Sequence, residues 1–161
     1  MNPSSGDVHS EPKIIVTNDE AAAIYDHLAA AYPLEGCGVL VGIKEQNAAQ
    51  IIRAVGTRNA DIQRATDKFT IEPLDLLGIE RRLGAEWKGF RIVGFFHSHP
   101  DAPAQPSVTD LEMAQGLFEV TQEFYIYAIV SIDAGIPQEA RYWQLSEDAL
   151  KFRELKTIEY L

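Results

Sequence analysis

The segment Gly94–Asp110, GFFHSHPDAPAQPSVTD, constrains the fold most, because it joins an apolar run, two histidines, a proline-rich loop and a helix start. The preceding run Phe90–Phe96 is rich in strand-forming residues and is bounded by glycine, which predicts a buried strand. If the strand stays extended to His99, then His97 and His99 project from one face and Ser98 from the other. The pattern therefore predicts two imidazoles side by side at a strand end, which is half of a zinc site.

The remaining ligand is expected beyond the loop. Three prolines between His99 and Ser107 exclude regular structure there. Ser107-Val-Thr-Asp110 then opens an apolar periodic segment and is typical of a helix start. Asp110 would lie in the first turn, where its carboxylate can reach back over the two imidazoles. Three protein ligands with one open position are typical of a catalytic zinc site and not of a structural one.

Length and composition indicate one domain with a buried core, because the chain has 161 residues and 46% of them are hydrophobic. We predict a loose tail over residues 1–12 and a single domain over residues 13–161. One cysteine excludes an internal disulfide bond and favours a reducing compartment. Neither a secretory signal nor an apolar run of membrane length is present, so we expect a cytoplasmic protein without a membrane partner.

The net charge is −10 and the sequence pI is about 4.8. This charge argues against nonspecific binding of nucleic acid, which requires a basic surface. The acidity is compatible with a salty habitat or with a basic partner, and the sequence does not decide between them.

Helices and strands are predicted in mixed order along the chain. Without strict alternation of strand and helix, the pattern favours an α+β or α/β fold with a mixed or mostly antiparallel sheet. The predicted strands lie near residues 13–16, 39–43, 50–55, 68–71, 90–96, 124–132 and 139–145, and the predicted helices near 17–32, 73–87, 107–120 and 148–159.

A zinc-dependent hydrolase also needs a carboxylate near the metal but not bound to it, which takes a proton from water and passes it to the leaving group. Glu35 is the favoured candidate, because it precedes Gly-Cys-Gly at a strand entrance where small residues leave room for a ligand.

Glu35, His97-Ser-His-Pro100 and Pro106-Ser-Val-Thr-Asp110 together resemble the signature of the JAMM (MPN+) zinc metallopeptidase family. The resemblance extends over about residues 13–143, and the flanking sequences are similar to the small bacterial stand-alone members. It implies the MPN fold, a curved sheet flanked by helices that is distantly similar to cytidine deaminases. A deaminase itself is disfavoured, because the Pro-Cys-x-x-Cys ligand pair is absent from the sequence.

The resemblance also implies a role for each motif residue. His97, His99 and Asp110 would bind Zn²⁺, with water as a fourth ligand. Glu35 would be the general base and then the acid that protonates the departing amine. Ser107 would donate a hydrogen bond to the oxyanion or to the water. Family members cleave peptide or isopeptide bonds after the C-terminal glycine of ubiquitin or a ubiquitin-like protein.

Each motif residue also has a simpler interpretation. Ser107 and Asp110 could form only a helix capping box, although capping and metal binding can coexist. The two histidines could be hydrogen-bonded residues at a strand end, and Glu35 an ordinary loop carboxylate. Cys37 could be a thiol nucleophile, but we expect it to pack as a small buried side chain between two glycines. His27 lies off the apolar face of its helix, which predicts a solvated surface residue.

Three functions remain open from the sequence. The favoured one is a peptidase that releases a group, such as the amino acid cysteine, from the Gly-Gly tail of a small ubiquitin-like sulfur carrier. Short connections around the site favour a compact enzyme that holds one such extended tail, which could add to a sheet edge. The alternatives are a deubiquitinase-like protease of a bacterial conjugation or antiphage operon and a non-catalytic MPN scaffold. The carrier, the leaving group and the oligomeric state stay open.

Overall fold

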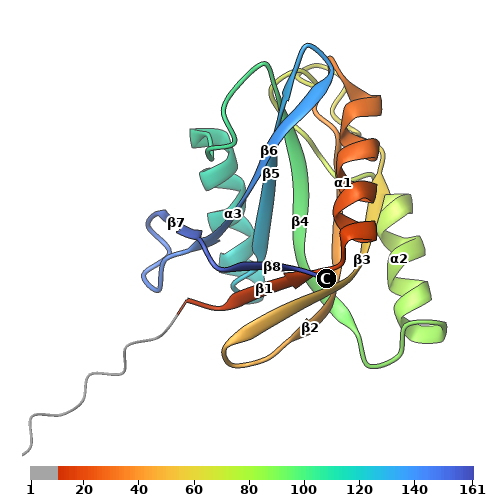
Figure 1. Cartoon of the computed structure of the whole chain (residues 1–161), viewed down its shortest axis with the longest axis vertical. Helices are drawn as coiled ribbons and strands as arrows, with labels where there is room; N and C mark the ends of the chain where they lie inside the picture. The colour runs from red at the N-terminus through yellow and green to blue at the C-terminus, as the bar shows by residue number, and fades with distance from the viewer. Residues whose placement is uncertain (1–10) are drawn as a thin grey trace, which may run out of the picture.

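The computed structural model describes residues 11–161, so the predicted tail over residues 1–12 lies almost wholly outside the described residues. Eight strands form one mixed sheet in the order β7-β6-β5-β4-β2-β3-β1-β8, and three helices pack on it (Figure 1). In chain order the elements are β1 (Lys13–Val16), α1 (Asn18–Ala31), β2 (Cys37–Lys44), β3 (Ala48–Thr57), α2 (Pro73–Ala85), β4 (Arg91–Pro100), α3 (Val108–Thr121), β5 (Ile126–Asp133), β6 (Ile136–Leu145), β7 (Phe152–Leu155) and β8 (Ile158–Tyr160).

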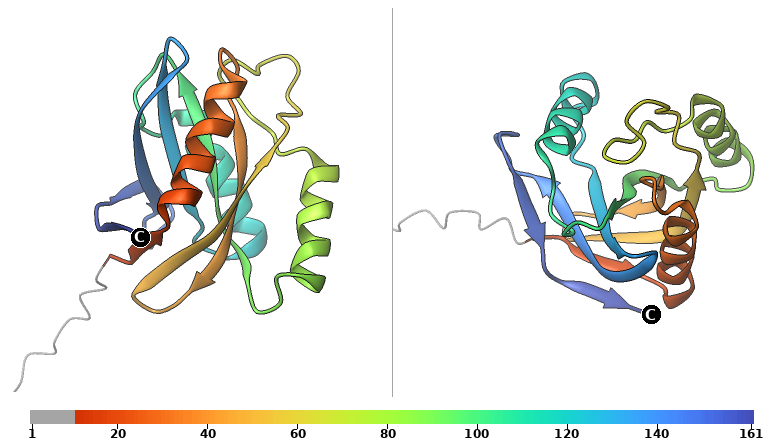
Figure 2. Two further views of the ribbon diagram at one scale, coloured as in Figure 1. Left: turned by 45° about the vertical axis from the view of Figure 1, so that its right-hand side comes forward. Right: turned by 90° about the horizontal axis from the view of Figure 1, so that it is seen from above.

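The sheet is curved, and the helices are divided between its two faces, with α1 on one side and α2 and α3 on the other (Figure 2). The alternation of side chains along the strands explains this division. Leu40 of β2 packs in the cluster that contains Leu28 of α1, whereas its neighbours Val39 and Val41 pack with Ile79 of α2. The central strands are therefore apolar on both faces, and the predicted mixed α+β architecture with a curved sheet is confirmed.

The close approach of β2 and β4 explains one glycine of the Glu-Gly-Cys-Gly entrance. A Cβ atom at Gly38 would lie 2.1 Å from the Phe96 ring and 2.5 Å from the carbonyl oxygen of Val55. Only a glycine leaves space for the buried Phe96 ring beside β2. The glycine at this strand entrance therefore permits the close approach of the neighbouring strands.

The predicted helix over residues 148–159 is wrong, because this segment forms β7 and β8 instead. β7 pairs with the otherwise free edge of β6, where the Arg141 guanidinium donates two hydrogen bonds to Glu154, at 2.8 and 2.7 Å. Leu155 enters the main core and Phe152 meets the Tyr127 ring. These tertiary contacts override the local helix propensity of the segment.

Two smaller predictions are also corrected. Residues 68–71 form no strand, only an isolated bridge between Ile71 and Asn59. His27 is not a solvated residue: its Nε2 atom lies 2.9 Å from the Cys37 carbonyl oxygen and 3.1 Å from that of Thr57. The imidazole supplies a hydrogen-bond donor to two carbonyl groups at strand ends. The pattern of apolar residues along the helix could not predict this contact, because both partners lie outside the helix.

None of the helices in the described part of the chain is long and apolar enough to cross a membrane.

Candidate metal centre

Strand β4 places two imidazoles on the sheet face that carries α2 and α3. β4 lies between β2 and β5 and pairs with both, so its backbone is fixed on either side. His97 and His99 are both buried, and their Nε2 atoms lie 3.2 Å apart. Ser98 points to the opposite face, where its hydroxyl oxygen accepts a hydrogen bond from the Gly36 amide at 2.8 Å. The predicted alternation of side chains along an extended strand is confirmed.

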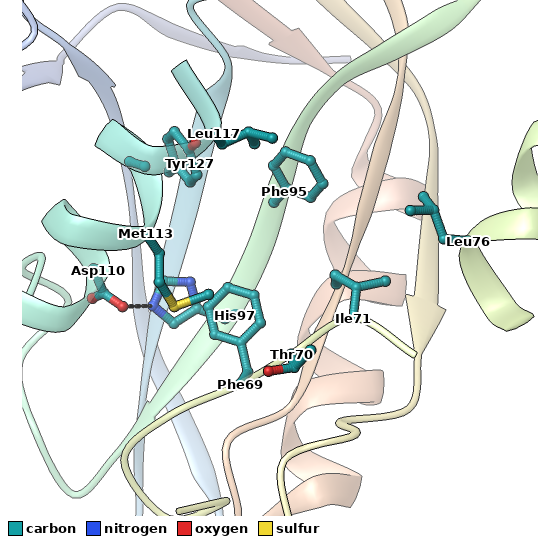
Figure 3. Close-up of a pocket in the computed structure, with 11 residues that line it drawn as sticks. Phe69, Thr70, Ile71, Leu76, Phe95, His97, Asp110, Met113, Leu117 and Tyr127 are labelled. Atoms are coloured by element: carbon teal, nitrogen blue, oxygen red, sulfur yellow. Dashed lines mark ion pairs between the residues drawn. The ribbon is translucent and has the colours of Figure 1, made fainter. Parts of the chain in front are cut away.

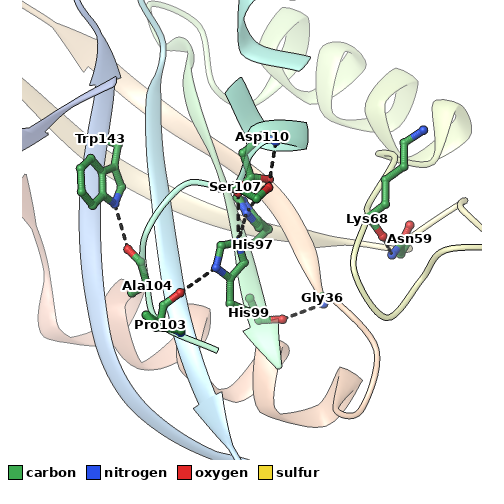
Figure 4. Close-up of polar contacts among 11 residues, drawn as sticks. Gly36, Asn59, Lys68, His97, His99, Pro103, Ala104, Ser107, Asp110 and Trp143 are labelled. Atoms are coloured by element: carbon green, nitrogen blue, oxygen red, sulfur yellow. Dashed lines mark hydrogen bonds and ion pairs between the residues drawn. The ribbon is translucent and has the colours of Figure 1, made fainter. Parts of the chain in front are cut away.

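Helix α3 brings the third group to the imidazoles. Asp110 lies in its first turn, and its two carboxylate oxygens face the two histidines. Oδ1 lies 3.2 Å from His97 Nε2 (Figure 3), and Oδ2 lies 3.0 Å from His99 Nε2. Ser107 is the N-cap: its hydroxyl accepts from the Asp110 amide at 3.0 Å, and its own amide donates to Oδ2 at 2.9 Å (Figure 4). The same Asp110 carboxylate therefore completes the capping box and faces the two histidines.

The donor set fits a divalent cation. The three groups offer ligand atoms that all lie within 4.8 Å of one another. His99 Nδ1 lies 2.7 Å from the Pro103 carbonyl oxygen and is the donor there, so a neutral His99 turns the bare lone pair of Nε2 toward the Asp110 carboxylate. Facing lone pairs repel one another unless a cation or a proton lies between them. Two imidazoles and a carboxylate are ligands that zinc accepts.

The titration behaviour of these groups follows from burial and mutual contact. Burial lowers the pKa of His97. Burial also disfavours a charged His99, but hydrogen bonds with Asp110 and with the Pro103 carbonyl outweigh it and raise the pKa of His99. For Asp110 the contacts with the two histidines outweigh burial and hold its pKa well below the usual range. The carboxylate is thus ionised and available as a ligand.

Glu35 lies beside this group without belonging to it. Because Cys37 of β2 pairs with His97, and the Ser98 amide donates to the Gly36 carbonyl at 3.1 Å, the same register brings Glu35 level with His99. Glu35 is only 4% exposed, and its Oε2 atom has no hydrogen-bond partner. Burial raises the pKa of Glu35 to about 8, although the nearby His99 opposes this rise. A carboxylate held in this way can exchange a proton near neutral pH.

An apolar groove of about 270 Å³ extends from His97 and Asp110 along α3, with β4 and β5 as its floor and α2 beyond (Figure 3). Phe69 closes its end over the centre, since its ring stacks on the His97 ring with centroids 4.5 Å apart. The sequence pattern did not single out Phe69, because its contact arises from an irregular connection. The lining residues are Phe69, Thr70, Ile71, Leu76, Phe95, His97, Asp110, Met113, Ala114, Leu117 and Tyr127.

Cys37 is buried between strands, as expected for a packing residue. Its sulfur lies 3.4 Å from the Thr57 hydroxyl and 3.7 Å from the Arg58 carbonyl oxygen. Burial raises the pKa of the Cys37 thiol to about 11. A thiol that is protonated at neutral pH is a poor nucleophile, so the geometry does not favour a cysteine protease.

Comparison with solved structures finds the same fold in other proteins. A protein of Salinibacter ruber, solved in solution, superposes with a TM-score of 0.64 at 32% identity, covering 89% of this chain and 90% of that one. A second solution structure, of a Desulfitobacterium hafniense protein, gives a TM-score of 0.73 at 24% identity, with 92% of each chain covered. The second likeness shows the fold alone.

Sequence comparisons agree with the fold. The chain is 32% identical to desampylase of Haloferax volcanii over 123 residues, which are 76% of each protein. It is 35% identical over 88 residues to tail tip assembly protein K of Escherichia phage N15, covering 55% of this chain but only 31% of that relative. The family model Prok-JAB, described as prokaryotic homologs of the JAB domain, matches residues 17–146. The chain therefore belongs to the prokaryotic JAB domain family, as its resemblance to the JAMM signature predicted.

Proposed function

We propose that the protein is a zinc-dependent metallopeptidase that hydrolyses the bond after the C-terminal glycine of a small ubiquitin-like or sulfur-carrier protein. One observation carries the proposal: a buried His97, His99 and Asp110 group lies beside the buried carboxyl group of Glu35, whose Oε2 atom has no hydrogen-bond partner. The relationship to desampylase supports a ubiquitin-like protein as substrate. Residues 13–161 would form the one catalytic domain.

His97, His99 and Asp110 would hold the zinc ion. When bound, zinc polarises a carbonyl group and lowers the pKa of a water molecule to about 7. Its positive charge would also favour the ionised form of the nearby Glu35 and bring the pKa of that carboxyl down from about 8. Glu35 would then be able to accept a proton at neutral pH.

The protein groups move the proton in two stages. Glu35 takes one proton from water while the water oxygen forms its bond to the scissile carbonyl carbon. When the carbon–nitrogen bond breaks, the same carboxyl gives this proton to the departing amine, so the residue returns to its ionised form. Ser107 is exposed, and its hydroxyl proton is free to point away from the helix cap. A hydrogen bond from it to the developing oxyanion would stabilise the transition state by about 3 kcal/mol.

The apolar groove is the place for the tail of the substrate. β4 already pairs with β2 and β5, and the sheet edges β7 and β8 are separated from it by two and three strands. Addition of the tail to a sheet edge, as the sequence suggested, would therefore not reach the centre. We propose that the tail lies extended in the groove, with apolar side chains against α3 and its terminal glycine at the centre.

The test uses zinc-loaded protein and a ubiquitin-like carrier whose terminal glycine is joined to cysteine, with release of cysteine followed by mass spectrometry. The wild type is expected to release cysteine. Glu35→Gln is expected to retain one zinc per chain and lose about 100- to 10,000-fold in kcat, because only proton transfer is removed. No release by the wild type at full zinc occupancy, or equal release by Glu35→Gln, would contradict the proposal.

Elemental analysis distinguishes this enzyme from a non-catalytic scaffold of the same fold. About one zinc per chain after gentle purification is expected of the enzyme, because the ligands are buried and preorganised. Zinc well below that ratio, with no activity after zinc is added back, would favour the scaffold.

A further inference from the structure

An irregular connection, residues 58–72 between β3 and α2, lies against both parts of the centre. The Phe69 ring in this connection stacks on His97. The Glu35 amide donates a hydrogen bond to the Ala65 carbonyl oxygen at 2.6 Å. This segment, which has no regular hydrogen bonding, thus contacts both the proposed ligand His97 and the proposed base Glu35. Its backbone must be held in place by other hydrogen bonds.

One side chain, Asn59, makes the connecting bonds, and Figure 4 shows it beside Lys68. Its Nδ2 atom donates to the Glu35 carbonyl oxygen at 3.1 Å and to the Lys68 carbonyl oxygen at 3.0 Å. Its Oδ1 atom accepts from the amides of Asp61 at 2.9 Å and Thr70 at 3.0 Å. These four bonds use both donors and both lone pairs of the amide, and the partners also fix which end is nitrogen.

The hydrogen-bond partners of Asn59 lie on both sides of Phe69 and at Glu35. Lys68 and Thr70 are the neighbours of Phe69, so the amide holds the backbone on both sides of the ring that covers His97. The Glu35 carbonyl belongs to the residue that is buried and whose carboxyl Oε2 atom has no hydrogen-bond partner. Fully satisfied polar networks of this kind are rigid, and removal of one partner leaves the others unpaired.

We propose that Asn59 is a positioning residue, which orients the Glu35 carboxyl by bonding its backbone carbonyl while holding Phe69 over His97 through the two neighbouring residues. The inference rests on the proposed function, in which Glu35 transfers the proton. Asn59 itself touches neither the substrate nor the reacting atoms. Its contribution is to fix the orientation of the Glu35 carboxyl toward the metal centre.

Asn59→Asp separates this role from a general effect on the loop. The substitution keeps an oxygen that can accept from Asp61 and Thr70, so the groove wall at Thr70 is retained. It replaces the donor by an oxygen that faces the carbonyl oxygens of Glu35 and Lys68, and both contacts become repulsive. The variant therefore releases Glu35 and Lys68, while the retained bonds from Asp61 and Thr70 keep the groove wall at Thr70 in place.

In the carrier–cysteine assay, Asn59→Asp is expected to lower kcat by about 10- to 100-fold, since a displacement of about 1 Å in a reacting group has an effect of this size. KM is expected to stay within about threefold and zinc at one per chain. Asn18→Asp is the matched control, because Asn18 is an exposed residue at the start of α1 and the substitution adds the same charge. It is expected to keep the wild-type kcat.

Hydrogen exchange of the metal-free protein gives a second readout that needs no turnover. The Glu35 amide is expected to exchange at least about tenfold faster in Asn59→Asp than in Asn18→Asp, because its loop partner is no longer fixed. Asn59→Ala, which removes the bonds without adding charge, replaces Asn59→Asp if that variant does not fold, and the same loss of kcat and of Glu35 protection is expected.

Several results would overturn the inference. These are an unchanged kcat, unchanged protection of the Glu35 amide, or a loss of zinc and a rise in KM together with the fall in kcat, which would indicate general damage to the loop. If the wild type itself releases no cysteine, the proposed function fails, and the exchange measurement still decides whether Asn59 holds Glu35.

Discussion

Replacement of Glu35 by glutamine is expected to change how the stability of the metal-free protein depends on pH. The side chain is buried, and this raises the pKa of its carboxyl from 4.5 to about 8. A carboxyl with a higher pKa in the folded chain binds its proton more tightly there than in the unfolded chain. Its contribution to stability is therefore complete below pH 4.5 and is lost as the pH rises through 8. Glutamine cannot ionise, so Glu35→Gln should not show this loss.

The size of the effect follows from the shift. One pKa unit corresponds to about 1.4 kcal/mol, so a change from 4.5 to about 8 sets a ceiling of about 5 kcal/mol. Movement of the surrounding loop lets water approach the ionised carboxylate, and we expect about 2 to 3 kcal/mol. Glu35→Gln should exceed the wild type in free energy of unfolding by that amount at pH 8 and by less than about 1 kcal/mol at pH 5.

The assay is urea unfolding of chelator-treated protein at pH 5, 6.5 and 8, followed by tryptophan fluorescence. His99 also has a raised pKa, and its contribution is likewise lost as the pH rises. The Glu35 charge is the smallest cause of that rise in pKa, so the difference between the two proteins reports Glu35 together with its coupling to His99. Zinc should reduce the difference, because a nearby cation favours the carboxylate. Parallel pH profiles for the two metal-free proteins would refute the reasoning that burial controls this carboxyl.

Four further substitutions test the centre and its surroundings. His99→Ala or Asp110→Ala should lower zinc affinity at least about 100-fold and activity with it, measured by competition with a chromophoric chelator. Asp110→Ala should also lower the free energy of unfolding by about 1 kcal/mol, because its capping bond is lost. A zinc affinity equal to that of the wild type would contradict the assignment of the substituted residue as a ligand. Cys37→Ala should keep kcat within about twofold and lower the free energy of unfolding by about 1 kcal/mol; a loss of activity above 100-fold would indicate thiol chemistry. Leu117→Arg should raise KM at least about tenfold with kcat and zinc content unchanged, and an unaltered KM would remove the groove from substrate binding.

The convergence of the three proposed ligands could be predicted because each is set by a local rule. His97 and His99 share a face because side chains alternate along any extended strand. Asp110 lies in the first turn because Ser107 satisfies the requirements of an N-cap, and those depend on four consecutive residues. The loop between strand and helix is short, so little freedom remains in how the two parts meet.

The features that the sequence did not predict depend on distant partners. The last helix was expected from local propensity, but β6 offered an unpaired edge and Arg141 a partner for Glu154. His27 was assigned to the surface because it lies off the apolar stripe of α1, whereas its imidazole meets carbonyl groups of β2 and β3, which lie beside it only in the folded chain. Asn59 belongs to the same class, since its partners extend from Glu35 to Thr70.

The capping box also explains how a helix start can prepare a metal ligand. The Ser107 amide donates to Oδ2 of Asp110, and this bond turns the carboxylate so that its two oxygens face different histidines. The partial positive charge at the N-terminus of α3 favours the ionised form that a metal requires. With three residues from serine to aspartate, the same hydrogen bonds cap the helix and orient the carboxylate toward the histidines. The capping interpretation and the ligand interpretation of this motif are therefore not competitors, because the cap is what orients the ligand.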